Sequence, residues 1–201
     1  MIKEGYISQK RLEWINKNVI RNKNFSWYLE PVTVLGFSKN WPAFSHTLIT
    51  RYDYDKLSTG DSNSDFEPFF TDLIKEICKE NKLSLKRILR GAINYTSYFE
   101  EKHSHTHYDH NWPHLNIIIY LNSFSKGSTY LFKETYSDVV QPHTAKKIQK
   151  EMKADVGKYV IFPGENYHAA GSVGKDDEYR MICIYNIETH NNIMKVGKKA
   201  K

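Results

Sequence analysis

The chain has 201 residues, of which 40% are hydrophobic, and a formal net charge of +6. This length allows one full hydrophobic core, so we expect a single domain over residues 1–201. The lysines and arginines are scattered except in the last residues, "MKVGKKAK", and a scattered positive charge does not indicate nucleic acid as a partner.

The sequence shows no sign of export or membrane insertion. Its two cysteines, Cys78 and Cys183, lie far apart in apolar settings, which favours a reducing compartment without a disulfide framework. The first residues lack the apolar run of a signal peptide, and no segment is long enough for a membrane span. We therefore expect a cytoplasmic protein with no membrane partner.

Two amphipathic helices are expected in the N-terminal part, residues 1–84. In "SQKRLEWINKNVI" the apolar residues Leu12, Ile15 and Val19 recur at helical spacing after Ser8, a residue type that caps helices. The second helix, "PFFTDLIKEICKENK", has its apolar residues at the same spacing, at Phe70, Leu73, Ile74 and Ile77. This part should support the core that follows it.

From residue 85 to about residue 190 the pattern changes to short strands. Five segments are rich in β-branched and aromatic residues: "RILRGAINYTSYF", "HLNIIIYLNSF", "STYLFKE", "KYVIFP" and "EYRMICIYNIE". Many short strands after two helices favour a sandwich or barrel with a helical layer against one face. The fold class is therefore mainly β with flanking helices, and residues 191–201 should form a frayed basic tail.

Five of the nine histidines lie in "HSHTHYDHNWPH", together with one aspartate. On an extended backbone His103, His105, His107 and Asp109 share one face. A carboxylate beside imidazoles suits a divalent cation, but such a site needs a further ligand from elsewhere in the chain. A His-x-Asp tripeptide alone is a weak signal, so the order of the residues downstream decides its value.

Two downstream residues have unusual settings. His168 follows an apolar strand and a Pro-Gly turn, and Arg180 shares a strand face with Ile182 and Ile184. Burying an arginine costs free energy unless it meets an anion, and an anionic small molecule is the simplest partner. The alternative is an ordinary ion pair with one of three neighbouring acidic residues, Asp176, Asp177 or Glu178.

The order His107, Asp109, His168 and Arg180 resembles the HxD…H…R pattern of iron(II)- and 2-oxoglutarate-dependent oxygenases, over about residues 85–189. The chain is most like small prolyl-4-hydroxylase-like members of viral or marine-bacterial type. The stretches "PHLNIIIYLNSFSKGSTYLF" and "GKYVIFPGENYH" resemble further elements of that family. The resemblance implies a double-stranded β-helix, a jelly-roll or cupin-like barrel, whose mouth holds the metal.

By this resemblance His107, Asp109 and His168 hold iron(II) on one face of an octahedron, and the cosubstrates 2-oxoglutarate and O2 take the remaining positions. Arg180 would pair with the C5 carboxylate of 2-oxoglutarate. The family often has a Ser two residues later, where this chain has Ile182. The implied reaction is hydroxylation with release of succinate and CO2, with ascorbate as a further cofactor of the family.

Three other residues are candidates for the cosubstrate pocket. Tyr120 occupies the place from which a tyrosine hydroxyl reaches the C5 carboxylate in oxygen-sensing prolyl hydroxylases, although it could also be a packed aromatic. Asn94 and Thr129 are expected to line the same pocket. His103 and His105 are expected at the pocket rim or on the surface. For His110 and His114 a position at the entrance, a solvent-facing position and a satisfied histidine stay open.

Two other classes of protein fit part of the sequence. "GKYVIFPGENYH" also resembles the second motif of cupins, so that His103 or His105, together with His107, would join His168 around Mn, Zn or Ni without 2-oxoglutarate. This interpretation leaves Arg180 without a role. A non-enzymatic RNA-binding module explains neither Asp109 nor the apolar setting of Arg180.

The sequence names no substrate. The presence of Asp109 argues against the halogenating members of the family, and Asn186 stands where nucleic-acid dealkylating members carry a second Arg. Hydroxylation of a peptide, an amino acid or another small substrate, for example at a prolyl or other amino-acid side chain, is therefore the default expectation. Loops at 58–67 and 141–153 would set the specificity.

Overall fold

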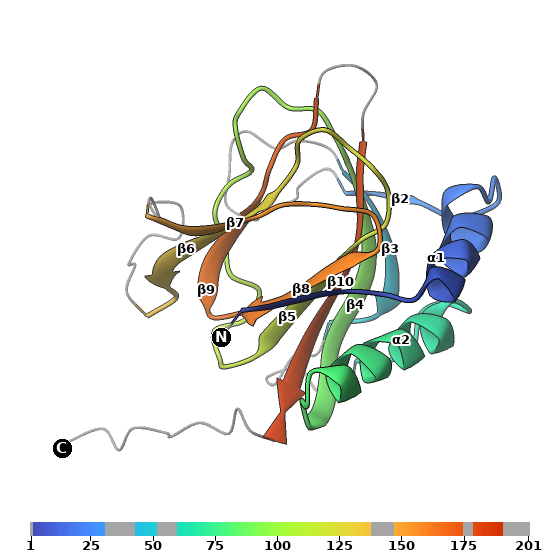
Figure 1. Cartoon of the computed structure of the whole chain (residues 1–201), viewed down its shortest axis with the longest axis horizontal. Helices are drawn as coiled ribbons and strands as arrows, with labels where there is room; N and C mark the ends of the chain where they lie inside the picture. Colours follow the sequence, from blue (N-terminus) through green and yellow to red (C-terminus); the bar gives the residue numbers. More distant parts are fainter. Residues whose placement is uncertain (1, 31–42, 52–59, 138–146, 175–178, 191–201) are drawn as a thin grey trace.

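The computed structural model describes residues 2–30, 43–51, 60–137, 147–174 and 179–190. They form two antiparallel sheets with a helical layer outside the larger one (Figure 1). The larger sheet has the strand order β1 (Lys3–Tyr6), β8 (Lys158–Pro163), β5 (Leu115–Tyr120), β10 (Tyr179–Thr189), β4 (Leu85–Ser97), β3 (Ala43–Ile49) and β2 (Tyr28–Glu30). The smaller sheet has the order β7 (Ile148–Met152), β6 (Thr129–Thr135) and β9 (Asn166–Ala170).

The helical layer follows from the amphipathic patterns in the sequence. Helix α1 (Gln9–Ile15) begins after Ser8, whose side chain accepts a hydrogen bond from the Arg11 backbone N–H at 3.4 Å. It continues as a π-helix, η1 (Asn16–Ile20), and helix α2 (Glu67–Glu80) lies beside it. Both helices that the sequence predicted are therefore confirmed.

The larger sheet is buried on both faces, and each face has its own apolar cluster. Ile117 and Ile119 of β5 pack with residues of α2 on the helical side. Ile118 of β5 packs toward the smaller sheet, together with Leu131 of β6 and Met152 of β7. Strand β5 is buried at all six positions, because alternate side chains enter different cores.

Two expectations about local structure are wrong. Residues 148–152, expected within a specificity loop, form β7, whose sequence "IQKEM" has only one buried side chain and so lacks a strand-like apolar pattern. The histidine-rich stretch is not a regular strand, because it makes only isolated bridges, His103 to Gly171 and His107 to His168. The predicted tail at 191–201 lies outside the described residues, and the single-domain assignment stays a prediction.

No helix in the described part of the chain has the length and apolar character needed to cross a bilayer.

Replacing Ile74 of α2 by alanine tests the helical layer. This fully buried side chain packs against the larger sheet, so we expect the free energy of unfolding to fall by about 2–5 kcal/mol. Chemical denaturation measures the change. Lys75→Ala, at an exposed position of the same helix, is the control and should change stability by less than about 0.5 kcal/mol.

Candidate metal and cosubstrate site

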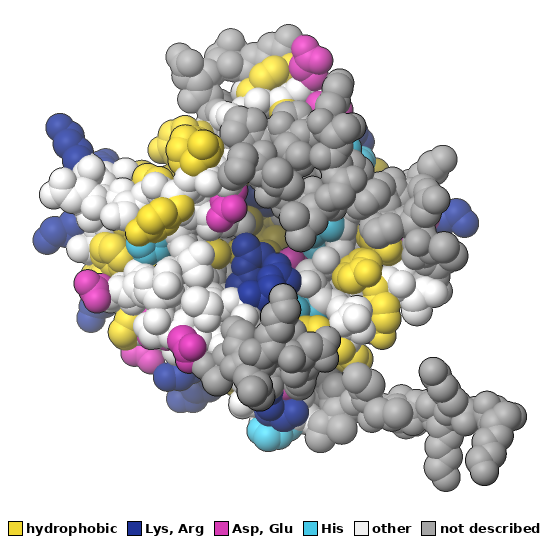
Figure 2. Space-filling model, turned by 180° about the vertical axis from the view of Figure 1, so that it is seen from behind, with side chains coloured by type: hydrophobic (Ala, Val, Ile, Leu, Met, Phe, Trp, Pro, Cys, Tyr) yellow, Lys and Arg dark blue, Asp and Glu magenta, His cyan; other side chains and the backbone are white. Residues whose placement is uncertain are grey.

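A cavity of about 270 Å³ lies between the two sheets and is lined by residues of both. Figure 2 shows a hollow in one face of the molecule, where Lys and Arg side chains gather beside His and acidic side chains. The lining of the cavity includes all four residues of the predicted motif, His107, Asp109, His168 and Arg180.

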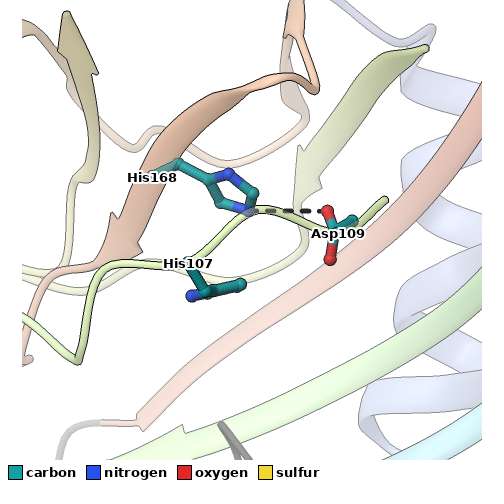
Figure 3. Close-up of side chains that lie close together, drawn as sticks. All are labelled: His107, Asp109 and His168. Atoms are coloured by element: carbon teal, nitrogen blue, oxygen red, sulfur yellow. Dashed lines mark ion pairs between the residues drawn. The ribbon is translucent and has the colours of Figure 1, made fainter. Parts of the chain in front are cut away.

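Three of these residues form a group that can hold one metal ion. His107 lies in the connection between β4 and β5, and its backbone exchanges hydrogen bonds of 3.0 and 2.8 Å with that of His168 on β9. Asp109 follows two residues later, and the ligand atoms of all three side chains lie within 4.8 Å of one another. Figure 3 shows the three side chains close together, His107 and Asp109 on one connection and His168 on β9.

Both imidazoles are oriented for metal binding. The Nδ1 atoms of His107 and His168 lie 3.1 and 3.2 Å from the carbonyl oxygens of His105 and Asn166, so an Nδ1 proton has an acceptor in each ring and Nε2 is the atom that can bind a metal. The buried Nε2 of His168 has no hydrogen-bond partner and lies 3.5 Å from Oδ2 of Asp109. An orphaned imidazole nitrogen facing a carboxylate fits a divalent cation of the iron(II) type.

Two asparagines that the sequence analysis did not assign to the site hold the Asp109 carboxylate. The amides of Asn116 on β5 and Asn186 on β10 donate to Oδ2 at 3.0 and 3.1 Å. The two residues face each other in register, and the Asn186 amide also donates to Oδ1 of Asn116 at 2.7 Å. Their signal in the sequence is an asparagine inside a run of buried apolar residues, as in "LNIIIY".

The electrostatics of the site prepare it for a cation. Burial, reinforced by the neighbouring His168, lowers the pKa of His107 to about 4, so its imidazole is neutral at physiological pH. Burial raises the pKa of the Asp109 carboxyl, but His168, His107 and Arg90 outweigh it and hold this pKa well below its usual range. A neutral imidazole and an ionised carboxylate are the protonation states that a metal ion requires.

Arg180 lies at another part of the same cavity and is only 2% exposed. Its Nε donates to the carbonyl oxygen of Gly127 at 2.9 Å, and Nη2 donates to Oγ1 of Thr129 at 3.0 Å. No carboxylate of the described residues pairs with this guanidinium. The acidic residues proposed as alternative partners, at 176–178, lie outside the described part of the chain.

The three lesser candidates have different positions. Asn94 and Thr129 line the cavity, as expected. Tyr120 is fully buried and does not line it, and its hydroxyl lies 2.8 Å from Oγ1 of Thr129 and 3.1 Å from the Met152 carbonyl oxygen. A direct contact of Tyr120 with the cosubstrate stays a prediction, whereas the geometry gives it a hydrogen bond to the Thr129 hydroxyl.

The other histidines of the stretch are not part of the metal group. His103 packs against the rings of Tyr130 and Phe132, with centroid distances of 5.5 Å to each. His110 and His114 are 4% and 1% exposed, so of the positions expected for them the solvent-facing one is wrong. Among the described residues, the group that can hold a metal contains Asp109 and neither His103 nor His105, which disfavours the cupin-type ligand set.

Packing explains why His114 is buried: it lies against the turn between β8 and β9. The His114 carbonyl oxygen accepts a hydrogen bond from the Gly164 N–H at 2.9 Å. A Cβ atom at position 164 would lie 1.9 Å from Nε2 of His114, so only glycine fits this turn. The turn leads into β9 and thus helps to place His168.

Solved structures share this architecture, although no family model and no curated protein matches the sequence. A 2OG-Fe(II) oxygenase family oxidoreductase from Burkholderia pseudomallei is similar with a TM-score of 0.64 at 13% identity, over 95% of this chain and 85% of that one. A Trichoplax adhaerens prolyl hydroxylase, in complex with a hypoxia inducible factor peptide fragment, gives 0.59 at 8% identity, over 96% and 84%. A Pseudomonas putida prolyl-4-hydroxylase gives 0.51 at 11%, over 94% and 92%.

At these identities the likeness shows the fold. The chain has the fold of the 2OG-Fe(II) oxygenases, the double-stranded β-helix that the sequence resemblance implied.

Replacing Asn186 by leucine tests the support of Asp109. Leucine has a similar size but no amide, so Asp109 loses one hydrogen bond that orients it. We expect the affinity for Co(II), used as a stable substitute for iron(II), to fall about 10–100-fold. Titration followed by calorimetry and visible absorbance measures the affinity.

Asn94→Leu is the matched control for this variant. Asn94 lines the same cavity but makes no hydrogen bond to Asp109, so its replacement should leave the Co(II) affinity unchanged. Equal affinity in the Asn186 variant and the wild type would show that the amide does not orient the carboxylate.

Proposed function

We propose that this protein is an iron(II)- and 2-oxoglutarate-dependent dioxygenase that hydroxylates its substrate with release of succinate and CO2. The observation that carries the proposal is the buried guanidinium of Arg180, without a carboxylate partner among the described residues, in the cavity that also holds the His-Asp-His group. A metal site alone fits many enzymes. A metal site together with a buried cation awaiting an anion fits a dicarboxylate cosubstrate.

The pairing of β6 with β9 sets the distance between Arg180 and the metal ligand His168. His168 of β9 pairs with Leu131 of β6, and Ala170 pairs with Thr129. Thr129 therefore lies two residues along the strand from the metal ligand, about 7 Å, and Arg180 is 3.0 Å from its hydroxyl. A five-carbon dicarboxylate spans such a gap with one end at Arg180 and the other at the metal ligands.

Each part of the chain has a defined task in this proposal. His107, Asp109 and His168 would hold iron(II) from one side and leave its other side open to the cavity. When bound, iron(II) with 2-oxoglutarate and O2 supplies the oxidising chemistry. Arg180 would bind the C5 carboxylate. Three isoleucine side chains that line the cavity would exclude water: Ile118, Ile182 and Ile184.

The class of substrate follows only by analogy with the neighbours. Two of them are prolyl hydroxylases, so a prolyl or other amino-acid side chain is the first class to test. A cupin-type enzyme that uses no 2-oxoglutarate is the alternative, and the titration below separates the two.

Anaerobic titration with iron(II) and then 2-oxoglutarate tests the proposal without a substrate. Binding of a keto acid through two oxygen atoms should produce a weak visible absorption band in the wild type. His107→Ala, Asp109→Ala and His168→Ala should each abolish this band and iron-dependent succinate formation, since each removes a metal ligand. Full succinate formation by His107→Ala would contradict the ligand assignment, and iron binding without any response to 2-oxoglutarate would favour the cupin-type alternative.

Replacing Arg180 by alanine tests the cosubstrate role. Loss of a buried partner of a carboxylate should weaken 2-oxoglutarate binding by about 2–5 kcal/mol while leaving Co(II) affinity within about threefold. Calorimetry on the wild type and the variant gives both values. Equal loss of metal and 2-oxoglutarate binding would identify Arg180 as structural.

Replacing Tyr120 by phenylalanine should weaken 2-oxoglutarate binding by roughly 1 kcal/mol, because it removes a hydrogen bond to Thr129.

A further inference from the structure

Arg90 is a second guanidinium of the cavity, and it lies far along the sheet from Arg180. In the pairing of β4 with β10, Arg90 faces Asn186, whereas Arg180 faces Thr96. The two positions are six residues apart, about 20 Å along the strands. Both residues line the cavity, and Asp109 lies at the Arg90 end. A 2-oxoglutarate molecule whose C5 carboxylate is bound at Arg180 therefore cannot place that carboxylate at Arg90.

The contacts of Arg90 leave its donors available to a ligand. Its nearest carboxylate oxygen is Oδ1 of Asp109, at 3.9 Å, and it makes no hydrogen bond with the described residues. The side chain is 25% exposed, and none of its five N–H groups has a partner of normal hydrogen-bond geometry among the residues that the structure describes. Arg51, which lines the same cavity, lies near Arg90 and adds a like charge, while Asp109 and Glu30 are the nearby acidic groups. A guanidinium in this setting is stabilised by an additional anion.

Once a metal is bound, Asp109 cannot serve as the anionic partner of Arg90. Its Oδ2 already accepts from two asparagine amides, and the carboxylate charge would be shared with the cation. The described lining residues carry three arginines against two carboxylates, Glu30 and Asp109. The charges of iron(II) and of the 2-oxoglutarate dianion cancel. The described lining residues then keep a net charge of +1, which one negative charge on the substrate would balance.

We propose that Arg90 binds a carboxylate of the primary substrate, so that the substrate is a carboxylic acid whose acid group lies beside the metal site. This inference rests on the proposed function and narrows its substrate. Arg51, which also lines the cavity, donates from Nη1 to the Asp109 carbonyl oxygen at 2.6 Å and adds a second positive charge next to Arg90. The planar guanidinium fork matches a carboxylate.

Fluorine NMR with trifluoroacetate tests the proposal directly. In protein loaded with paramagnetic Co(II) and saturated with 2-oxoglutarate, a fluorinated carboxylate held at Arg90 lies close to the metal, so its resonance should broaden. Trifluoroacetamide, the neutral analogue, should broaden far less. Arg90→Gln removes the charge but keeps a polar side chain, and we expect it to weaken trifluoroacetate binding about tenfold. The 2-oxoglutarate affinity should stay at the wild-type value, and the Co(II) affinity should change far less than the trifluoroacetate affinity, because the two asparagine amides still hold Asp109.

Arg87→Gln is the matched control. Arg87 lies on the same strand, pairs with Glu188 at 3.6 Å and does not line the cavity, so its replacement should leave the broadening unchanged. Equal broadening in Arg90→Gln and the wild type would overturn the proposal. So would an equal loss of Co(II) and trifluoroacetate affinity in Arg90→Gln, which would show that Arg90 acts only through Asp109.

A second measurement separates this inference from the proposed function. The fluorine experiment is repeated with Co(II) alone, so that it tests Arg90 even if 2-oxoglutarate does not bind. Failure of 2-oxoglutarate to bind would refute only the proposed function.

In a screen of succinate formation, free amino acids are compared with their amides and with a proline-rich peptide lacking acidic groups. We expect stimulation by acids alone, lost in Arg90→Gln. Stimulation by a neutral amide or by the peptide would overturn the carboxylate assignment.

Discussion

The site depends on one ionised carboxylate, Asp109, held between two sheets where only 4% of its side chain is exposed. A buried charge of this kind is costly unless hydrogen bonds and opposite charges surround it. Here the amides come from β5 and β10, an imidazole from β9 and a guanidinium from β4. Because these elements lie far apart in sequence, the stabilising environment exists only when both sheets are in place, and the metal site forms together with the fold.

The central strands divide their residues between the core and the site. In β5 the odd-numbered residues face the helices, whereas Asn116 and Ile118 face the other sheet. Strand β10 follows the same rule with Cys183 and Tyr185 on the helical side. A shift of one residue in the pairing of β5 with β10 would exchange the two sets, placing asparagine in the apolar core and isoleucine at the carboxylate. The hydrophobic core thus fixes the register that brings the polar residues together.

The sequence predicted those features that are encoded by local periodicity or by an ordered motif. Both helices, five strands and the convergence of His107, Asp109 and His168 belong to this group. Strand β7 could not be predicted, because its residues are mostly exposed and carry no alternation. The role of Asn186 could not be predicted either, since its hydrogen bond to Asp109 joins residues 77 positions apart. Such contacts follow from sheet register, which one sequence does not state.

The two cavity arginines differ in how firmly the protein holds them, and this difference suits two kinds of ligand. Arg180 uses two of its five N–H groups on Gly127 and Thr129, so the direction of its remaining donors is fixed before any ligand arrives. Fixed donors suit a cosubstrate of constant shape. Arg90 makes no hydrogen bond with the described residues and keeps more conformational freedom. It can adjust to the position of a substrate carboxylate, at the cost of the entropy lost when that ligand binds.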